Sequence, residues 1–193
     1  MRRFLSVAFL FITAASHFVF AQEKARENGP DPATAREIVE KQFGPGFTRL
    51  ADVPAIVADF DGDRVADLAL AAKASNPLLN AVEYNYKVID PYHSFYGFGN
   101  PAVTLQFEVE DPRQKGTVVL IIHGANDGGW SAAAPKAKFV VVNFPYTRLT
   151  HTQVLLHKKP VGAIAAEETD TVSSVIYWDG KKYRYRPNGA ASN

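Results

Sequence analysis

The sequence lacks cysteine entirely, and neither sign of charge dominates it. Without cysteine, no disulfide can cross-link the 193 residues, and no lipid-modified cysteine can follow the N-terminal segment. Lysine and arginine total 21 against 20 aspartates and glutamates, so the net charge of +1 indicates neither nucleic acid nor an anionic membrane as a partner. The five histidines include no pair with the spacing of a zinc site. A bound metal ion is the obvious substitute for a disulfide, because it stabilises only the folded chain.

The first 21 residues have the pattern of a secretory signal peptide. Arg2 and Arg3 precede a mainly apolar block over residues 4–20, and Ala21 provides a small residue for cleavage before Gln22. Polar residues interrupt that block too often for a membrane anchor. Removal of the segment takes away two basic residues, leaving 19 against 20 acidic ones and a net charge of −1. We expect export to the periplasm or the extracellular space, with no membrane span after cleavage.

The apolar pattern beyond this segment predicts a mainly β (α+β) fold. Residues 22–30 are polar and predict a flexible leader, and residues 31–189 predict one β-rich domain. A single helix is expected from a cap at Asp31 to a stop at Gly44. About seven to nine strands are expected after it. They cover residues 53–58, 68–72, 103–109, 117–122, 139–142, 154–156, 161–166, 172–178 and 181–186. Asp179-Gly180 is typical of a hairpin turn, so we expect an antiparallel sheet or sandwich with the helix packed on it.

Four aspartates lie between the first two of these strands. Asp59, Asp61, Asp63 and Asp67 occupy positions 1, 3, 5 and 9 of a nine-residue run. Alternate residues of a tightly curled loop can all direct oxygen atoms at one hard cation. With the main-chain carbonyl of Val65 at position 7, these ligands suit calcium, which takes six to eight oxygens, better than octahedral magnesium. The sequence therefore predicts a calcium site made by these five residues.

This run resembles the calcium loop of the FG-GAP or VCBS repeat family, in which D-x-D-G-D-G-x-x-D-L lies between two strands. An EF-hand needs a glutamate at position 12, where this chain has Leu70. Arg64 replaces the usual glycine at position 6, where a positive φ is often required, so we expect a weakened site. Segments 121–124, 135–139 and 174–185 resemble further parts of single-domain exported members. The resemblance implies a propeller-blade-like calcium hairpin in a binding or structural module without an assigned activity.

An extracytoplasmic hydrolase is the alternative interpretation, based on the loop from Gly124 to Ser131. The apolar run before His123-Gly124 resembles the strand and oxyanion turn of an α/β-hydrolase. The nucleophile elbow G-x-S-x-G is incomplete, and no acidic residue lies between Ser131 and His157, the last histidine. We therefore assign no catalytic residue, and we interpret His123 as a strand-end histidine that bonds to backbone groups.

Residues 76–101 show no sustained period and are rich in aromatic side chains. Tyr92, Tyr96 and Trp130, with neighbouring rings, could form a platform for a sugar or a peptide. The competing interpretation is that these rings close the loop onto the sheet. A glycan or a protein is accordingly the partner expected from the sequence.

Overall fold

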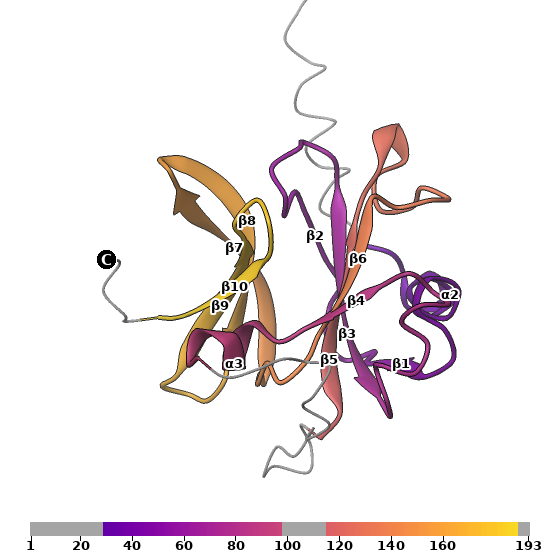
Figure 1. The fold of residues 1–193 in the computed structure, drawn as a ribbon, viewed down its shortest axis with the longest axis horizontal. Coiled ribbons are helices and arrows are strands. Elements are labelled where there is room, and N and C mark those ends of the chain that lie inside the picture. The colour runs from indigo at the N-terminus through magenta and orange to yellow at the C-terminus, as the bar shows by residue number, and fades with distance from the viewer. Residues whose placement is uncertain (1–28, 98–114, 189–193) are drawn as a thin grey trace, which may run out of the picture.

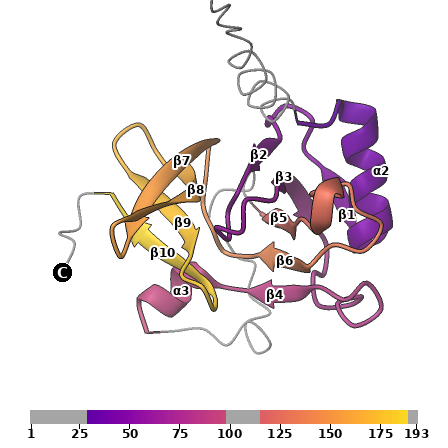
Figure 2. The ribbon, with the colours of Figure 1, turned by 90° about the horizontal axis from the view of Figure 1, so that it is seen from above.

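A computed structural model describes residues 29–97 and 115–188, and the structural account concerns these residues. Ten strands within them form a six-stranded and a four-stranded sheet, with helix α2 (Pro32–Phe43) near the N-terminal end. Figures 1 and 2 show three layers, in which the six-stranded sheet lies between α2 and the four-stranded sheet. The mainly β fold with one N-terminal helix, predicted from the sequence, is confirmed.

The six-stranded sheet contains the two strands that carry the candidate site. Its order is β1 (Phe47–Arg49), β3 (Asp67–Ala74), β5 (Thr117–His123), β6 (Ala137–Val141) and β4 (Lys87–Ile89), and β2 (Ile56–Ala58) also pairs with β3. All pairs are antiparallel except β4 with β6, which is parallel. That exception departs from the purely antiparallel arrangement expected from the sequence, because β4 lies in the stretch without a sustained period.

Strands β3 and β5 are apolar on both faces because both faces of their sheet are covered. Ala69 and Ile121 point into a core shared with the four-stranded sheet, together with Phe60 and Ile164. Their chain neighbours point the other way, into a core shared with α2. That second core includes Val39, Phe43, Leu68, Leu70, Leu120 and Ile122. A strand buried on both faces has no polar face, which explains the continuous apolar runs in the sequence.

The four-stranded sheet is an antiparallel meander in the order β10-β9-β8-β7. Its strands are β7 (Arg148–Leu156), β8 (Lys159–Glu167), β9 (Ser173–Trp178) and β10 (Tyr183–Pro187). The predicted last hairpin is present, although its turn lies one residue later than expected. The N–H of Asp179 donates to the carbonyl of Lys182 (3.0 Å), which makes Gly180 and Lys181 the central residues. Gly180 has φ 96°, as glycine at the first central position of a two-residue turn often has.

Several sequence expectations were incomplete or lie outside the described residues. Strands β1 and β4 and the short helix α3 (Pro91–Phe95) were not predicted from the sequence, and β2 begins at Ile56 rather than at residue 53 as expected. Strands β7 and β8 have nine residues each, longer than expected. The signal peptide, most of the leader and the strand predicted at 103–109 fall outside the described residues. No helix in the described part is long and apolar enough to cross a membrane.

The turn between β7 and β8 carries backbone strain that substitution should relieve. His157 and Lys158 have φ 50° and 66°, and they join Leu156 to its partner Lys159. Non-glycine residues in this left-handed region cost roughly 1 kcal/mol each. Lys158→Gly is therefore expected to raise the free energy of unfolding by about 0.5 kcal/mol, measured by urea denaturation. The control Lys159→Gly, in extended strand, should lower it by a similar amount; equal effects of the two substitutions would contradict the assignment of strain to Lys158.

Candidate metal centre

The candidate metal centre is the loop of residues 59–67, which connects β2 to β3. One side chain holds this loop in a curl: Oδ1 of Asp59 accepts from the N–H groups of Gly62 (2.7 Å) and Asp63 (3.1 Å), and its Oδ2 accepts from Arg64 (2.8 Å). Arg64 has φ 70°, the positive value expected at position 6 of the loop. The local sequence therefore folds around its first aspartate.

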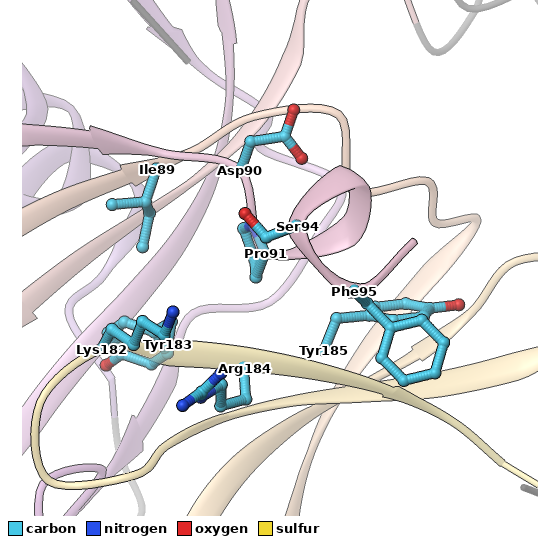
Figure 3. A pocket seen from close by; sticks show the side chains of 9 residues that line it. All are labelled: Ile89, Asp90, Pro91, Ser94, Phe95, Lys182, Tyr183, Arg184 and Tyr185. Carbon is cyan, nitrogen blue, oxygen red and sulfur yellow. The ribbon is translucent and has the colours of Figure 1, made fainter. Parts of the chain in front are cut away.

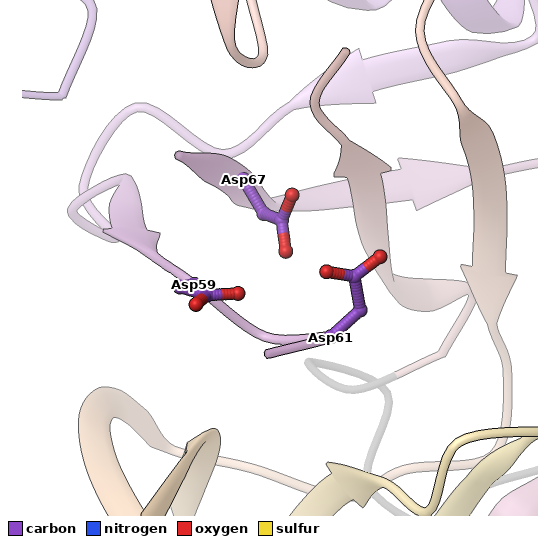
Figure 4. A group of neighbouring side chains, drawn as sticks. All are labelled: Asp59, Asp61 and Asp67. Carbon is purple, nitrogen blue, oxygen red and sulfur yellow. The ribbon is translucent and has the colours of Figure 1, made fainter. Parts of the chain in front are cut away.

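Three carboxylates converge inside this curl. Figure 4 shows the side chains of Asp59, Asp61 and Asp67 pointing toward one another. One oxygen from each of them lies within 4.8 Å of the others. Asp67 opens β3 and is fully buried. Its Oδ2 accepts from the N–H of Phe60 (2.8 Å) and its Oδ1 from the N–H of Gly124 (2.7 Å), so its position is fixed by main-chain groups on both sides. One cation could contact all three residues.

The charge on Asp67 is unfavourable without a cation nearby. Burial raises the pKa of its carboxyl group to about 7, and the negative charges of Asp61 and Asp59 act in the same direction. The two N–H donors lower the pKa but do not offset the burial. A positive ion next to Asp67 would favour the ionised form and relieve this cost.

Lys136 supplies one positive charge to the loop from the segment before β6. Its Nζ lies 2.6 Å from Oδ2 of Asp61 and 2.8 Å from Oδ2 of Asp63. Burial alone would raise the pKa of Asp63, but the bonds from Lys136 and from the N–H of Val65 hold it below its usual value. The same two carboxylates raise the pKa of Lys136. This lysine was not predicted as part of the site, because no local spacing in the sequence connects it to the aspartates.

A buried histidine joins the loop to the four-stranded sheet. Nδ1 of His123 lies 3.4 Å from Oδ2 of Asp61, and its Nε2 lies 2.7 Å from the hydroxyl of Tyr183 in β10. The rings of Phe139 and Trp178 pack against the imidazole. Burial lowers the pKa of His123, with Asp61 acting in the opposite direction. The side-chain partners correct the expectation that backbone groups alone satisfy this histidine.

Two glycines let the backbone approach the loop closely. The N–H of Gly162 in β8 donates to the carbonyl of Asp59 (3.2 Å), and a Cβ atom at Gly162 would lie 2.3 Å from that oxygen. At the end of β5, a Cβ on Gly124 would lie 2.4 Å from the carbonyl oxygen of Ala66. The loop is therefore held between both sheets, and its shape depends on residues far away in the sequence.

The arrangement brings together three of the five ligands predicted from the sequence. Asp59, Asp61 and Asp67 form the convergent group, whereas Asp63 pairs with Lys136. The main chain of Val65 is held by a hydrogen bond in which its N–H donates to Oδ1 of Asp63 (2.8 Å). The convergent donors are all carboxylate oxygens, the ligand type that calcium and magnesium prefer. These residues fit a hard divalent cation.

The chain was also compared with known proteins. No family model, curated protein or solved structure matches it. The resemblance to the FG-GAP or VCBS calcium loop therefore stays a prediction, based on the residues of the loop itself.

The contacts of the Gly124–Ser131 loop do not assemble a hydrolase site. The N–H of Gly124 donates to Asp67, and the hydroxyl of Ser131 donates to the carbonyl of Gly128 (2.7 Å). Among residues 29–97 and 115–188, no histidine is hydrogen-bonded to Ser131. Strand β5 is antiparallel to both of its neighbours, whereas the corresponding strand of an α/β-hydrolase lies in a largely parallel sheet. Within the described residues, the contacts of this loop therefore do not support the hydrolase alternative.

The aromatic residues predicted to form a platform are divided between two places. The rings of Tyr92 and Tyr96 lie 5.3 Å apart, and both contact Tyr185 of β10. Tyr96 is half exposed, whereas Tyr92 packs partly against the core between the sheets. Trp130 packs against the separate core beside α2. The two tyrosines therefore lie together as predicted for a platform, whereas the tryptophan lies in a different part of the molecule.

Proposed function

We propose that residues 59–67 bind one calcium ion, which fastens the loop at the junction of the two sheets in an exported binding or structural module. The observation that carries this proposal is the convergence of oxygens from Asp59, Asp61 and Asp67 within 4.8 Å. Calcium would contribute positive charge and coordination there. The chain itself positions the ligands. Asp59 accepts hydrogen bonds that curl the loop, and main-chain N–H groups hold Asp67 in place.

Charge balance supports a cation at this position. Four loop carboxylates, Asp59, Asp61, Asp63 and Asp67, have Lys136 as their ion-pair partner within the described residues, and it contacts only two of them. Like charges at this spacing repel one another and raise the free energy of the ion-free fold. A divalent ion would reduce that repulsion and would stabilise the folded chain alone.

The contact of Lys136 with Asp61 also sets an expectation for affinity. An ammonium 2.6 Å from a proposed ligand competes with an incoming ion for the same carboxylate. Together with Arg64 at position 6, it argues for a weak site. Calcium sites of extracellular modules have Kd values of about 10⁻⁴ to 10⁻³ M, and the signal-peptide pattern supports a location where such a site would be filled.

Thermal unfolding in calcium and in chelator tests this proposal. At about 10 mM calcium and a Kd of about 0.1 to 1 mM, binding contributes roughly 1.4 to 2.7 kcal/mol. The melting temperature should therefore rise by about 3 to 10 °C for a domain of this size. Asp61→Asn should abolish the rise, and the exposed control Asp170→Asn should retain it. Equal melting temperatures of the wild type in calcium and in chelator would refute the proposal.

A further inference from the structure

A cavity of about 210 Å³ lies where the helix α3 packs against β10, and none of the loop residues 59–67 lines it. Figure 3 shows Lys182 and Tyr183 at one end of this hollow and Phe95 and Tyr185 at the other. Ile89 and Pro91 lie across from β10. The volume is below the roughly 300–1,000 Å³ typical of small-molecule pockets. A cavity of this volume can hold one amino-acid residue with an apolar side chain.

The strand that borders the cavity is the edge of its sheet. Strand β10 pairs with β9 on one side, and among residues 29–97 and 115–188 no strand pairs with its other side. Two main-chain hydrogen bonds lie at the ends of the β9–β10 ladder. The N–H of Asp179 donates to the carbonyl of Lys182, and the N–H of Asn188 donates to the carbonyl of Ser173. Hydrogen-bonded and non-hydrogen-bonded pairs alternate along an antiparallel ladder. Even-numbered residues of β10 therefore bond to β9.

The odd-numbered residues of β10 direct their main-chain groups at the free edge. These residues are Tyr183, Tyr185 and Pro187, and the first two line the cavity. Pro187 has no N–H, so it offers no donor at the far end of the edge. Tyr183 and Tyr185 thus present the main-chain donors and acceptors that an added antiparallel strand would use.

The charged groups around the cavity favour an anion at the Lys182 end. Asp90 is an acidic lining residue, but its buried carboxylate accepts from the N–H and ring of His93 and from Asn143. Arg184 is paired with Asp179 through Nε (2.5 Å). Lys182 is exposed and forms no ion pair within the described ranges. It is the charge available to a ligand.

We propose that this cavity binds the C-terminal residue of an extended peptide from another protein. The peptide would run antiparallel to β10, since only that direction brings its C-terminus to Lys182 at the start of the strand. Its last residue would pair with Tyr183, and its carboxylate would contact Lys182. The side chain of that residue would point to the same face as Tyr183, toward Ile89 and Pro91. A peptide ending in an apolar residue with a free carboxylate is therefore the occupant.

Fluorescence anisotropy with two labelled peptides tests this inference, and chelator in the buffer keeps the test independent of the cation site. Both peptides end in Ser-Thr-Val; one has a free carboxylate and the other an amide. The free acid should bind at least about tenfold more tightly than the amide, because only the acid carries the charge. Lys182→Gln should weaken binding of the acid about tenfold. The neighbouring exposed Lys181→Gln serves as the matched control and should change it less than twofold.

Hydrogen exchange supplies a second readout that does not depend on substitution. The amides of Tyr183 and Tyr185 should exchange rapidly in the free protein, while those of Arg184 and Arg186 are protected by β9. Addition of the free-acid peptide should protect Tyr183. The inference is overturned if both peptides bind equally or neither binds at millimolar concentration. It is also overturned if Tyr183 is already protected, which would show that another part of this chain occupies the edge.

Discussion

Replacing Asp67 with alanine is expected to lower the free energy of unfolding by about 3 kcal/mol at pH 4 in the presence of chelator. The substitution leaves the buried N–H groups of Phe60 and Gly124 without their acceptor. Each unpaired buried donor costs about 1–3 kcal/mol. Urea denaturation followed by circular dichroism measures the loss. A change below about 0.5 kcal/mol would mean that water replaces the carboxylate and that Asp67 does not hold the loop.

The pH dependence of stability provides a test of the buried charge on the same residue. Burial raises the pKa of Asp67 from 3.8 to about 7. A group whose pKa is raised by folding contributes its full stability below its unfolded pKa and loses it as the pH rises through the folded value. In chelator, the wild type should therefore lose about 4 kcal/mol relative to Asp67→Asn between pH 4 and pH 8. Parallel pH profiles of the two proteins would contradict the raised pKa.

Gly162→Ala is expected to lower the free energy of unfolding by about 2–3 kcal/mol, even though it adds only a methyl group. Its Cβ would lie 2.3 Å from the carbonyl oxygen of Asp59, a main-chain atom that cannot move without displacing the loop. Overpacking of this kind typically costs 1–3 kcal/mol. The control Gly46→Ala, where nothing lies within 4 Å of the added carbon, should change stability by less than about 0.5 kcal/mol.

The same two variants also test whether the packing of β8 on the loop affects calcium binding as well as stability. Because the added methyl group displaces Asp59, Gly162→Ala should bind calcium more weakly than the wild type. Gly46→Ala should bind calcium as the wild type does. Chemical denaturation and calcium titration of both proteins measure the two effects. If Gly162→Ala proves as stable as Gly46→Ala, the close approach of β8 to the loop is not part of the native packing.

Features with a local cause could be predicted from the sequence. Helix α2 begins where Asp31 accepts from two main-chain N–H groups and ends at Gly44 with φ 90°, both encoded by neighbouring residues. The three convergent aspartates lie within nine residues of one another, so a curled loop was enough to predict from the sequence that they would converge. The central strand β5 was recognisable because burial on both faces requires an uninterrupted apolar run.

Features that depend on distant partners could not be predicted. Strands β1 and β4 have three residues each, too few to show a period, and they exist because β3 and β6 offer them partners. Lys136 enters the candidate site from the segment just before β6 and His123 from the end of β5, and no spacing in the sequence relates them to the aspartates. The free edge of β10 is likewise a property of the sheet order rather than of the strand's own residues.

The most direct test of the cation site is isothermal titration of calcium into the metal-free protein and into Lys136→Gln. We expect one calcium per chain in the wild type. Removal of the competing ammonium, 2.6 Å from Asp61, should tighten binding about tenfold in Lys136→Gln. Absence of calcium binding by both proteins at about 10 mM, well above the Kd range of extracellular sites, would contradict the account and leave Lys136 as the lysine or arginine that pairs with the loop carboxylates within the described residues.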